Sequence, residues 1–285
     1  MMDWFGRSHT YISNVCGDVV EHLQKRFGKL LHWDHHRLTK EKLKYYARHV
    51  EQVGGGDLIW GYIDGTLQKI CRPSENQRLF YSGHKHHHGF KFQGVITPDG
   101  IFSSFFGPII GSRGDWYIFG KSGLEDIVDR IFEGDEKTLY IYGDPAYHGS
   151  NATMAPYRKP RNAQLTAAQR EFNIEMSRRR VSVEHGFGHI QQNWMRNSFS
   201  LTLRVGQTPV ASYYLAAVLM ANFMTCLRGN QISEAFQCVP PTLEEYLESL
   251  SSERGSEARE GETREGEAQE GEVQEGDIAD AGRVS

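Results

Sequence analysis

The sequence lacks the hallmarks of membrane, secreted and disulfide-stabilised proteins. No run reaches the roughly 18 consecutive apolar residues of a membrane helix. The nearest segment, Val210 to Cys226, is interrupted by polar residues and predicts a buried helix. The N-terminus has no basic-then-apolar pattern, so no secretory signal is expected. The four cysteines lie far apart, which excludes a disulfide framework and a Cys-x-x-Cys zinc site.

The overall charge conceals two unlike regions. The chain has 285 residues and a net charge of −4, with 39% hydrophobic residues, as in a globular protein. Residues 251–285 include 11 acidic and 4 basic residues, so the remaining 250 residues have a net charge of +3 and contain all 13 histidines. A mildly basic body with an acidic tail is compatible with a nucleic-acid partner, as it is with many ordinary enzymes.

Composition divides the chain into four expected segments. Residues 1–56 predict a short helical segment, in which Ser13 caps a first helix and Thr39 caps a second. The apolar face expected on the first helix consists of Val15, Val19, Val20, Leu23 and Phe27. Three glycines then mark a boundary, and residues 57–228 predict an α/β domain. Residues 229–250 predict a C-terminal helical extension. Residues 251–285 repeat Glu-Gly every five residues and predict a disordered acidic tail.

Within the α/β segment, short apolar runs alternate with helical periodicity. Two runs flank the turn Pro98-Asp99-Gly100 as in a β-hairpin. The order of elements predicts a mixed sheet flanked by helices. The expected strands are Leu58 to Ile63, Phe90 to Ile96, Ile101 to Ile110 and Leu139 to Tyr142, and the expected helices are Ser122 to Phe132, Thr166 to His189 and Thr208 to Leu227.

Three carboxylates stand out by position. Asp64 and Asp144 each end an apolar strand, and if these strands are adjacent and parallel, both side chains project from the edge where open α/β sheets bind ligands. Glu184 borders a core-facing helical stripe that begins at Val183 and continues through Phe187. Carboxylate oxygens are the ligands that magnesium prefers, and two such ions can promote phosphodiester cleavage. An Asp after a strand is also a common turn or cap, so spacing alone leaves both interpretations open.

These residues lie in blocks that resemble a known family. Tyr62 to Thr66, Tyr142 to Tyr147 and Arg180 to Glu184 are similar to the three signature blocks of PIF/Harbinger-type transposases, which are DDE endonucleases with an RNase H-like fold. Several connecting blocks extend the resemblance over roughly Ile59 to Leu227: Cys71-Arg72-Pro73, Tyr81 to Lys85, Phe90 to Gln93, Thr97 to Gly100, Gly107-Pro108 and Phe172-Asn173, with a further block at Pro240 to Tyr246. Several ordered blocks are more specific than one short motif.

The resemblance implies that Asp64, Asp144 and Glu184 form a catalytic triad that holds two Mg²⁺ or Mn²⁺ ions. The family's His-Asp pair after the third strand is Gly114-Asp115 here, so Asp115 is a candidate support residue. The His that often follows the first block is replaced by Leu67. Phe5 to Ser13 resembles the second half of the family's helix-turn-helix, whose recognition helix would enter the major groove.

Basic residues near these blocks are candidate contacts to the DNA backbone, because phosphate contacts need positive charge rather than a particular sequence. Solvated surface is the alternative interpretation for each. Trp116 is expected to pack in the core, with stacking on a base as the alternative. The candidate backbone contacts are Lys85, Arg158, Lys159, Arg178 and Arg179.

The resemblance therefore predicts a metal-dependent, DDE-type nuclease that cleaves DNA phosphodiesters as a transposase. Gly114, Leu67 and the short N-terminal segment motivate an alternative, a decayed or domesticated transposase that binds DNA or a protein without cutting. A dead element without activity is a further alternative. The family also implies a Myb-like DNA-binding partner, and the DNA substrate implies nuclear residence. The sequence leaves the oligomeric state open, and a dimer is compatible with it.

Overall fold

The computed structural model describes residues 5–135, 138–198, 203–248 and 250. Its helical elements are α2 (His9–Phe27), η1 (Gly28–Leu31), α3 (Lys40–Gln52), α4 (Gln77–Phe80), α5 (Asp115–Ser122), α6 (Leu124–Phe132), α7 (Ala167–Asn193), η2 (Met195–Ser198), α8 (Val210–Arg228) and α9 (Gln231–Ala235). Its strands are β1 (Ile59–Lys69), β2 (Tyr81–Ser82), β3 (His87–Ile96), β4 (Phe102–Ile110), β5 (Tyr140–Tyr142) and β6 (Thr153–Met154).

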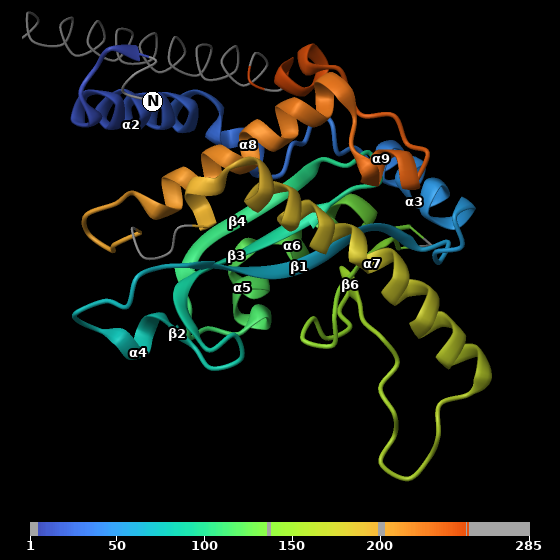
Figure 1. The fold of residues 1–285 in the computed structure, drawn as a ribbon. Helices are drawn as coiled ribbons and strands as arrows, with labels where there is room; N and C mark the ends of the chain where they lie inside the picture. Colours follow the sequence, from blue (N-terminus) through green and yellow to red (C-terminus); the bar gives the residue numbers. More distant parts are fainter. Residues whose placement is uncertain (1–4, 136–137, 199–202, 249, 251–285) are drawn as a thin grey trace, which may run out of the picture.

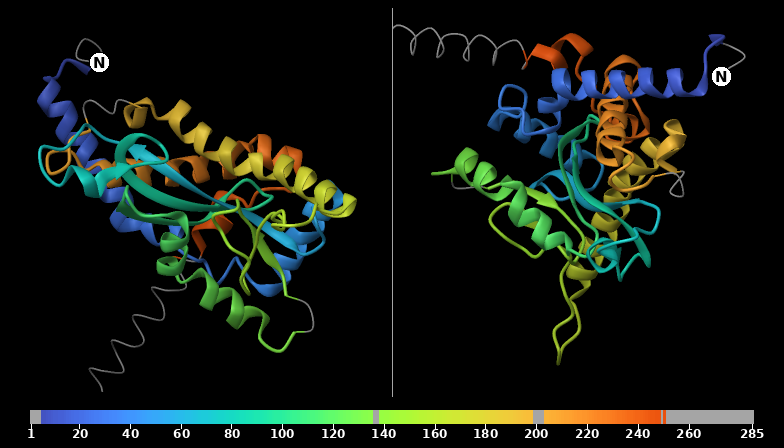
Figure 2. Two further views of the ribbon diagram at one scale, coloured as in Figure 1. Left: turned by 90° about the horizontal axis from the view of Figure 1, so that it is seen from below. Right: turned by 90° about the vertical axis from the view of Figure 1, so that its left-hand side faces the viewer.

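The strands form one mixed sheet, as expected. β4, β3 and β1 pair antiparallel, whereas β5 and then β6 add parallel to β1. The short strand β2 pairs with the start of β3. Viewed along the sheet, α5 and α6 lie on one side and α7 and α8 on the other (Figures 1 and 2). This arrangement of a mixed sheet between helices is consistent with an RNase H-like α/β fold.

Strand β1 is longer than the sequence predicts. We expected it to end at Asp64, but it continues to Lys69, so that prediction is wrong. The extension exists because Asp64 to Lys69 pair antiparallel with β3, from Asp64 opposite Gly94 to Lys69 opposite Gly89. Only the first part of β1, through Tyr62, has a parallel neighbour in β5. Asp64 therefore lies within a strand, just past the end of its parallel pairing.

Helix boundaries follow the capping residues with one exception. Thr39 caps α3 as predicted, and Thr166 caps α7 through a capping box. Helix α2 begins earlier than expected, because Ser8 rather than Ser13 accepts the hydrogen bond that caps it. The predicted inward face of α2 is confirmed only in part, since Val15 and Val19 are exposed whereas Val20, Leu23 and Phe27 are partly buried. The helix lies against α8, where Phe27 contacts Phe223 with ring centroids 5.5 Å apart.

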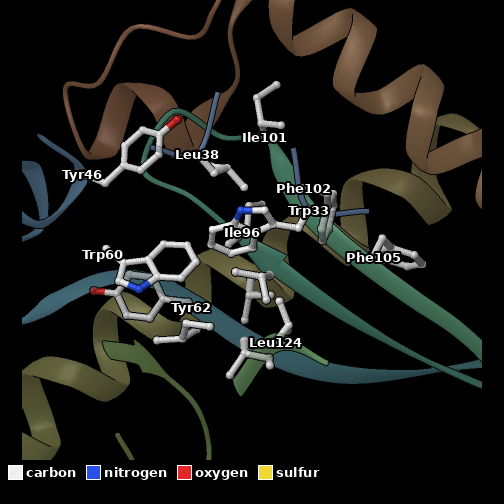
Figure 3. Close-up of a cluster of buried hydrophobic side chains, with 14 of the residues drawn as sticks. Trp33, Leu38, Tyr46, Trp60, Tyr62, Ile96, Ile101, Phe102, Phe105 and Leu124 are labelled. Carbon is white, nitrogen blue, oxygen red and sulfur yellow. The ribbon is translucent and has the colours of Figure 1, made fainter. Parts of the chain in front are cut away.

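The core contains many aromatic side chains and joins the N-terminal helices to the sheet. Figure 3 shows Trp33 and Trp60 side by side, with their ring centroids 5.6 Å apart in an edge-to-face contact. Helix α3 packs on β1, and its Tyr46 is fully buried. The hydroxyl of Tyr46 donates to Asp99 Oδ2 in the β3–β4 turn at 2.5 Å, and the buried Arg37 guanidinium contacts the same carboxylate. These buried polar contacts fix the segment before β1 to the hairpin.

Helix α8 is an apolar core helix. Within the described part of the chain it alone is long and apolar enough to cross a membrane by length and composition. Half of that stretch is buried inside the molecule, however, including Tyr214 and Leu219. Its Asn222 side chain exchanges hydrogen bonds with the backbone of Phe102 in β4. The expected buried helix is therefore confirmed.

Helix α7 crosses the sheet with the predicted apolar stripe inward. Val183, Phe187 and Ile190 are buried. Gly186 permits a close approach, since a Cβ there would lie 2.8 Å from Ile96 Cδ1. Gly188, two residues further along the helix, has open space around it. The crossing holds the middle of α7 beside β1 and β3, which is where Glu184 is placed.

Candidate active site

The parallel pairing of β1 and β5 places the two aspartates on neighbouring strands. Tyr62 is opposite Tyr142, and Asp64 and Asp144 each follow two residues later. The condition that these strands are adjacent and parallel is thus met. Asp64 is mostly buried, with 19% of its side chain exposed, and accepts a hydrogen bond from the Gly65 N–H at 2.8 Å. Asp144 similarly accepts from the Ala146 N–H at 2.8 Å, so backbone amides orient both carboxylates.

Glu184 is connected to Asp64 through an arginine on its own helix. Arg180 Nη1 lies 3.2 Å from Asp64 Oδ2, and Arg180 Nη2 lies 2.8 Å from Glu184 Oε1. Arg180 precedes Glu184 by one helical turn, so one guanidinium reaches both carboxylates. The Glu184 side chain is about half exposed, whereas that of Asp64 is mostly covered. The bridge brings an acid from α7 to the acid in the middle of β1.

Burial, with smaller contributions from nearby charges, changes the ionisation of Asp64. Burial raises the pKa of Asp64 from 3.8 to about 6, the Arg180 guanidinium and the Gly65 N–H oppose the rise, and the Asp144 and Glu184 carboxylates add to it. Both other acids are therefore close enough to repel a negative charge at Asp64. A site that gathers carboxylates in this way stabilises a cation.

The donor types fit a divalent cation, although the present arrangement is set by Arg180. Three carboxylates supply the oxygen ligands that Mg²⁺ and Mn²⁺ take. Among the residues that the structure describes, no three His, Cys, Asp or Glu side chains are grouped as a ready-made metal cluster. The positive charge between Asp64 and Glu184 is supplied by the guanidinium instead. A bound ion would have to compete with Arg180 for these oxygens.

Asp115 lies beside the first aspartate, at the start of α5. Its Oδ1 is 3.0 Å from Lys91 Nζ on β3, and a Cβ at Gly65 would lie only 2.5 Å from the same oxygen. The glycine next to Asp64 therefore allows Asp115 to approach β1. In this structure Lys91 neutralises Asp115.

Tyr147 adds a polar group that sequence reasoning missed. The residue is fully buried, its N–H donates to the Asp144 carbonyl at 3.0 Å, and its hydroxyl has no hydrogen-bond partner. A Cβ at Gly65 would lie 3.6 Å from that hydroxyl. Burial raises the pKa of Tyr147 well above its usual value, and the Asp115, Asp64 and Asp144 carboxylates raise it further. The hydroxyl is thus a neutral, unpaired donor close to Gly65, the residue that follows Asp64.

The candidate DNA-contacting residues occupy different settings. Lys85 is exposed in the turn between β2 and β3, and Lys159 is exposed in the long β6–α7 loop that projects from the body (Figure 1). Arg158, in the same loop, donates to the Pro145 carbonyl next to Asp144. The arginines before Glu184 differ: Arg178 is exposed and pairs with Glu175, whereas Arg179 donates to the Val53 carbonyl.

Trp116 is not the core residue that we expected. Its side chain is 40% exposed, because it lies in the first turn of α5 while the buried face of that helix is formed by Ile118 and Phe119. The signal in the sequence for Arg180 and Tyr147 was their presence within the signature blocks. Neither could be given a role before the contacts of Arg180 and the unpaired Tyr147 hydroxyl were seen.

Comparison with known proteins identifies the family. The family model described as DDE superfamily endonuclease matches residues 63–222, which include all three carboxylates, and the chain belongs to that family. The chain is also 29% identical over 127 residues to the "Probable transposase for insertion sequence element IS702" of Microchaete diplosiphon. That alignment covers 43% of this chain and 43% of the relative, so the chain spans less than half of the relative's length. No solved structure matches the chain. The protein is thus of the transposase-derived DDE type.

Proposed function

We propose that this protein is a divalent-metal-dependent DNA endonuclease that cleaves phosphodiester bonds as a transposase, with Asp64, Asp144 and Glu184 as its catalytic residues. The observation that carries the proposal is the register of β1 and β5, which brings Asp64 and Asp144 to one edge with Glu184 linked to Asp64 through Arg180. Membership of the DDE endonuclease family supports the reaction class.

The chain's own residues have distinct tasks in this proposal. Asp64 and Asp144, oriented by the Gly65 and Ala146 amides, present fixed oxygens, and Glu184 supplies the third carboxylate from α7. The Tyr147 hydroxyl can donate to one of these oxygens. Two Mg²⁺ or Mn²⁺ ions, when bound, would activate a water and stabilise the leaving oxygen of the scissile phosphate. Released from its carboxylates, Arg180 can contact the phosphate, which it suits as a bidentate donor.

Nicking of supercoiled plasmid in Mn²⁺ tests the proposal. The full chain is compared with Asp144→Asn and with Asp18→Asn, in which an exposed acid on α2 is replaced as a matched control. We expect cleavage by the parent and the control, and a loss of at least about 100-fold in Asp144→Asn, since a removed ligand weakens charge stabilisation in the transition state. Equal cleavage by Asp144→Asn would refute the assignment of the triad.

A second candidate function is a DNA- or protein-binding module that no longer cuts. The observation that favours it is the Arg180 bridge, which neutralises two of the three carboxylates without an ion. Gly114 and Leu67 stand where the family often has histidines. Mn²⁺ binding separates the candidates, because a module of this kind need not bind the ion, whereas the endonuclease must.

The proposal also includes the DNA ligand, the residues that contact it, the partner protein and the cellular location. DNA ends of the element are the proposed ligand, and the exposed Lys85, Arg158 and Lys159 are the proposed backbone contacts, together with Arg178. Arg179 is proposed only as a weaker contact because Val53 and Glu175 already engage it. A Myb-like DNA-binding partner, a dimeric assembly and nuclear residence complete the proposal. A pull-down of the full chain that recovers neither DNA nor a partner would count against these extensions.

A further inference from the structure

An exposed aromatic patch lies next to the candidate active site. Trp116 and Tyr117 on α5 are 40% and 41% exposed, and His148, in the loop after β5, is exposed as well. The Trp116 and His148 rings lie nearly parallel, with centroids 5.1 Å apart and an interplanar angle of 23°. We define these three residues and Arg113 as the aromatic patch.

The patch rests on a buried support. Trp116 is also stacked on Phe119, with centroids 5.4 Å apart and an angle of 27°, and Phe119 is 1% exposed. Phe119 in turn packs edge-on against the buried Tyr147 at 6.2 Å. The Trp116 ring therefore has one nearly parallel neighbour in the core, Phe119, and one at the surface, His148. A ring that is already fixed by packing against a buried residue loses little conformational freedom when a flat ligand stacks on it.

Trp116 and His148 each directly follow, in the sequence, a residue that lies at the acidic site. Asp115, which precedes Trp116, closely approaches Gly65 beside Asp64. Tyr147, which precedes His148, is hydrogen-bonded through its N–H to the Asp144 carbonyl. A nucleotide strand whose phosphate lies at the carboxylates would therefore bring its neighbouring bases to this patch.

The patch also offers a cation at its edge. The exposed Arg113 places its guanidinium carbon 4.7 Å from the centre of the Tyr117 ring. Aromatic faces beside an arginine are the combination that binds single-stranded nucleic acid, in which bases stack and the cation contacts phosphate. Bases inside a duplex already stack on both faces, so they cannot use such a surface. The ligand class is consequently a nucleobase outside the duplex stack.

We propose that Trp116 and His148 form a stacking platform for one unpaired nucleobase, with Arg113 contacting a phosphate of the same strand. The proposal rests on the proposed function, since it places the strand at the carboxylates. It goes beyond that function by assigning the DNA conformation that the protein selects: a strand end or an extruded base rather than continuous duplex.

Fluorescence of 2-aminopurine tests the platform. The probe is a duplex with a short single-stranded overhang that contains 2-aminopurine, mixed with saturating full-length protein in Ca²⁺ to slow cleavage. Parent protein should quench the probe, and Trp116→Ala should lose most of that quenching. Affinity for the overhang should fall by about 5- to 150-fold in Trp116→Ala, as expected for one stacked base. Affinity for a blunt duplex should change less than about twofold.

Two further variants serve as controls. Trp116→Phe keeps an aromatic ring and should retain most of the quenching, which separates stacking from a folding defect. Tyr81→Ala removes a similarly exposed ring that also contacts a histidine, His88 at 5.2 Å, and should behave as the parent at saturation. Overhang binding that is unchanged in Trp116→Ala, or an unquenched probe in a saturated parent complex, would overturn the platform and leave the nuclease proposal standing. Parent protein that binds neither DNA would overturn both.

Discussion

Replacing Asp64 by Asn is expected to stabilise the metal-free protein at neutral pH. Burial raises the pKa of Asp64 to about 6, so the folded state holds its proton more tightly than the unfolded chain does. The folded protein therefore loses stability as the pH rises from about 4 to about 6, because ionised Asp64 is less favourable in its buried site than in water. Asn resembles the protonated acid in shape and lacks the charge, so it removes this cost.

The size of the effect follows from the pKa. The difference between 3.8 and about 6 corresponds to at most roughly 3 kcal/mol above pH 7. Since 19% of the side chain is exposed and water screens part of the cost, we expect about 1–3 kcal/mol. At about pH 4.5 the advantage of Asn should shrink to about a third of that value, because the acid is then mostly protonated in the folded protein.

Thermal unfolding in EDTA measures this prediction. Each kcal/mol raises the midpoint by about 2–4 °C in a domain of this size. Asp18→Asn, which changes an exposed acid, is the control and should show no such pH-dependent gain. Added Mn²⁺ should stabilise the parent and have little effect on Asp64→Asn. If Asp64→Asn were as stable as the parent, or less stable, in EDTA at neutral pH, the electrostatic description of the site would be wrong.

Three other substitutions test separate parts of the structure. Arg180→Gln should lower the stability of the metal-free protein at neutral pH, because Asp64 and Glu184 lose their counter-ion. The same change should tighten Mn²⁺ binding, because the ion no longer competes with the guanidinium. Unfolding measures the first effect and Mn²⁺ titration the second, and weaker Mn²⁺ binding would argue against competition. Gly65→Ala should lower the free energy of unfolding by about 1–3 kcal/mol and reduce nicking, since the added Cβ would collide with Asp115. An unchanged free energy of unfolding would contradict the close approach of Asp115 to Gly65. Asp99→Asn should lower the free energy of unfolding by about 1–3 kcal/mol, because it removes one of the two carboxylates that face the buried Arg37 guanidinium; unchanged denaturant unfolding would mean that the network is dispensable.

Much of the framework could be predicted from periodicity and turn residues. The hairpin around Pro98-Asp99-Gly100, the cap at Thr39, and the buried stripe on α7 follow from local sequence, and the structure confirms them. The adjacency of Asp64 and Asp144 could be anticipated because parallel strands in an α/β sheet present equivalent ends.

The remaining features depend on contacts between distant segments. Residues after Asp64 look like a turn because they include glycine and polar side chains, yet pairing with β3 extends the strand to Lys69. The exposure of Trp116 is decided by which face of α5 meets the sheet. The contact of Arg180 with Asp64 joins residues 116 positions apart, which no local pattern reveals. The tail prediction for residues 251–285 lies outside the described residues.

Binding of Mn²⁺ to the full chain shows whether the three carboxylates hold a metal ion. Titration followed by electron paramagnetic resonance counts free and bound ions in the parent, in Asp144→Asn and in the exposed-acid control Asp18→Asn. We expect saturable binding by the parent and the control, and at least about tenfold weaker binding by Asp144→Asn, because a carboxylate ligand is lost. Equal binding by all three proteins would contradict the claim that Asp64, Asp144 and Glu184 form one metal-binding site.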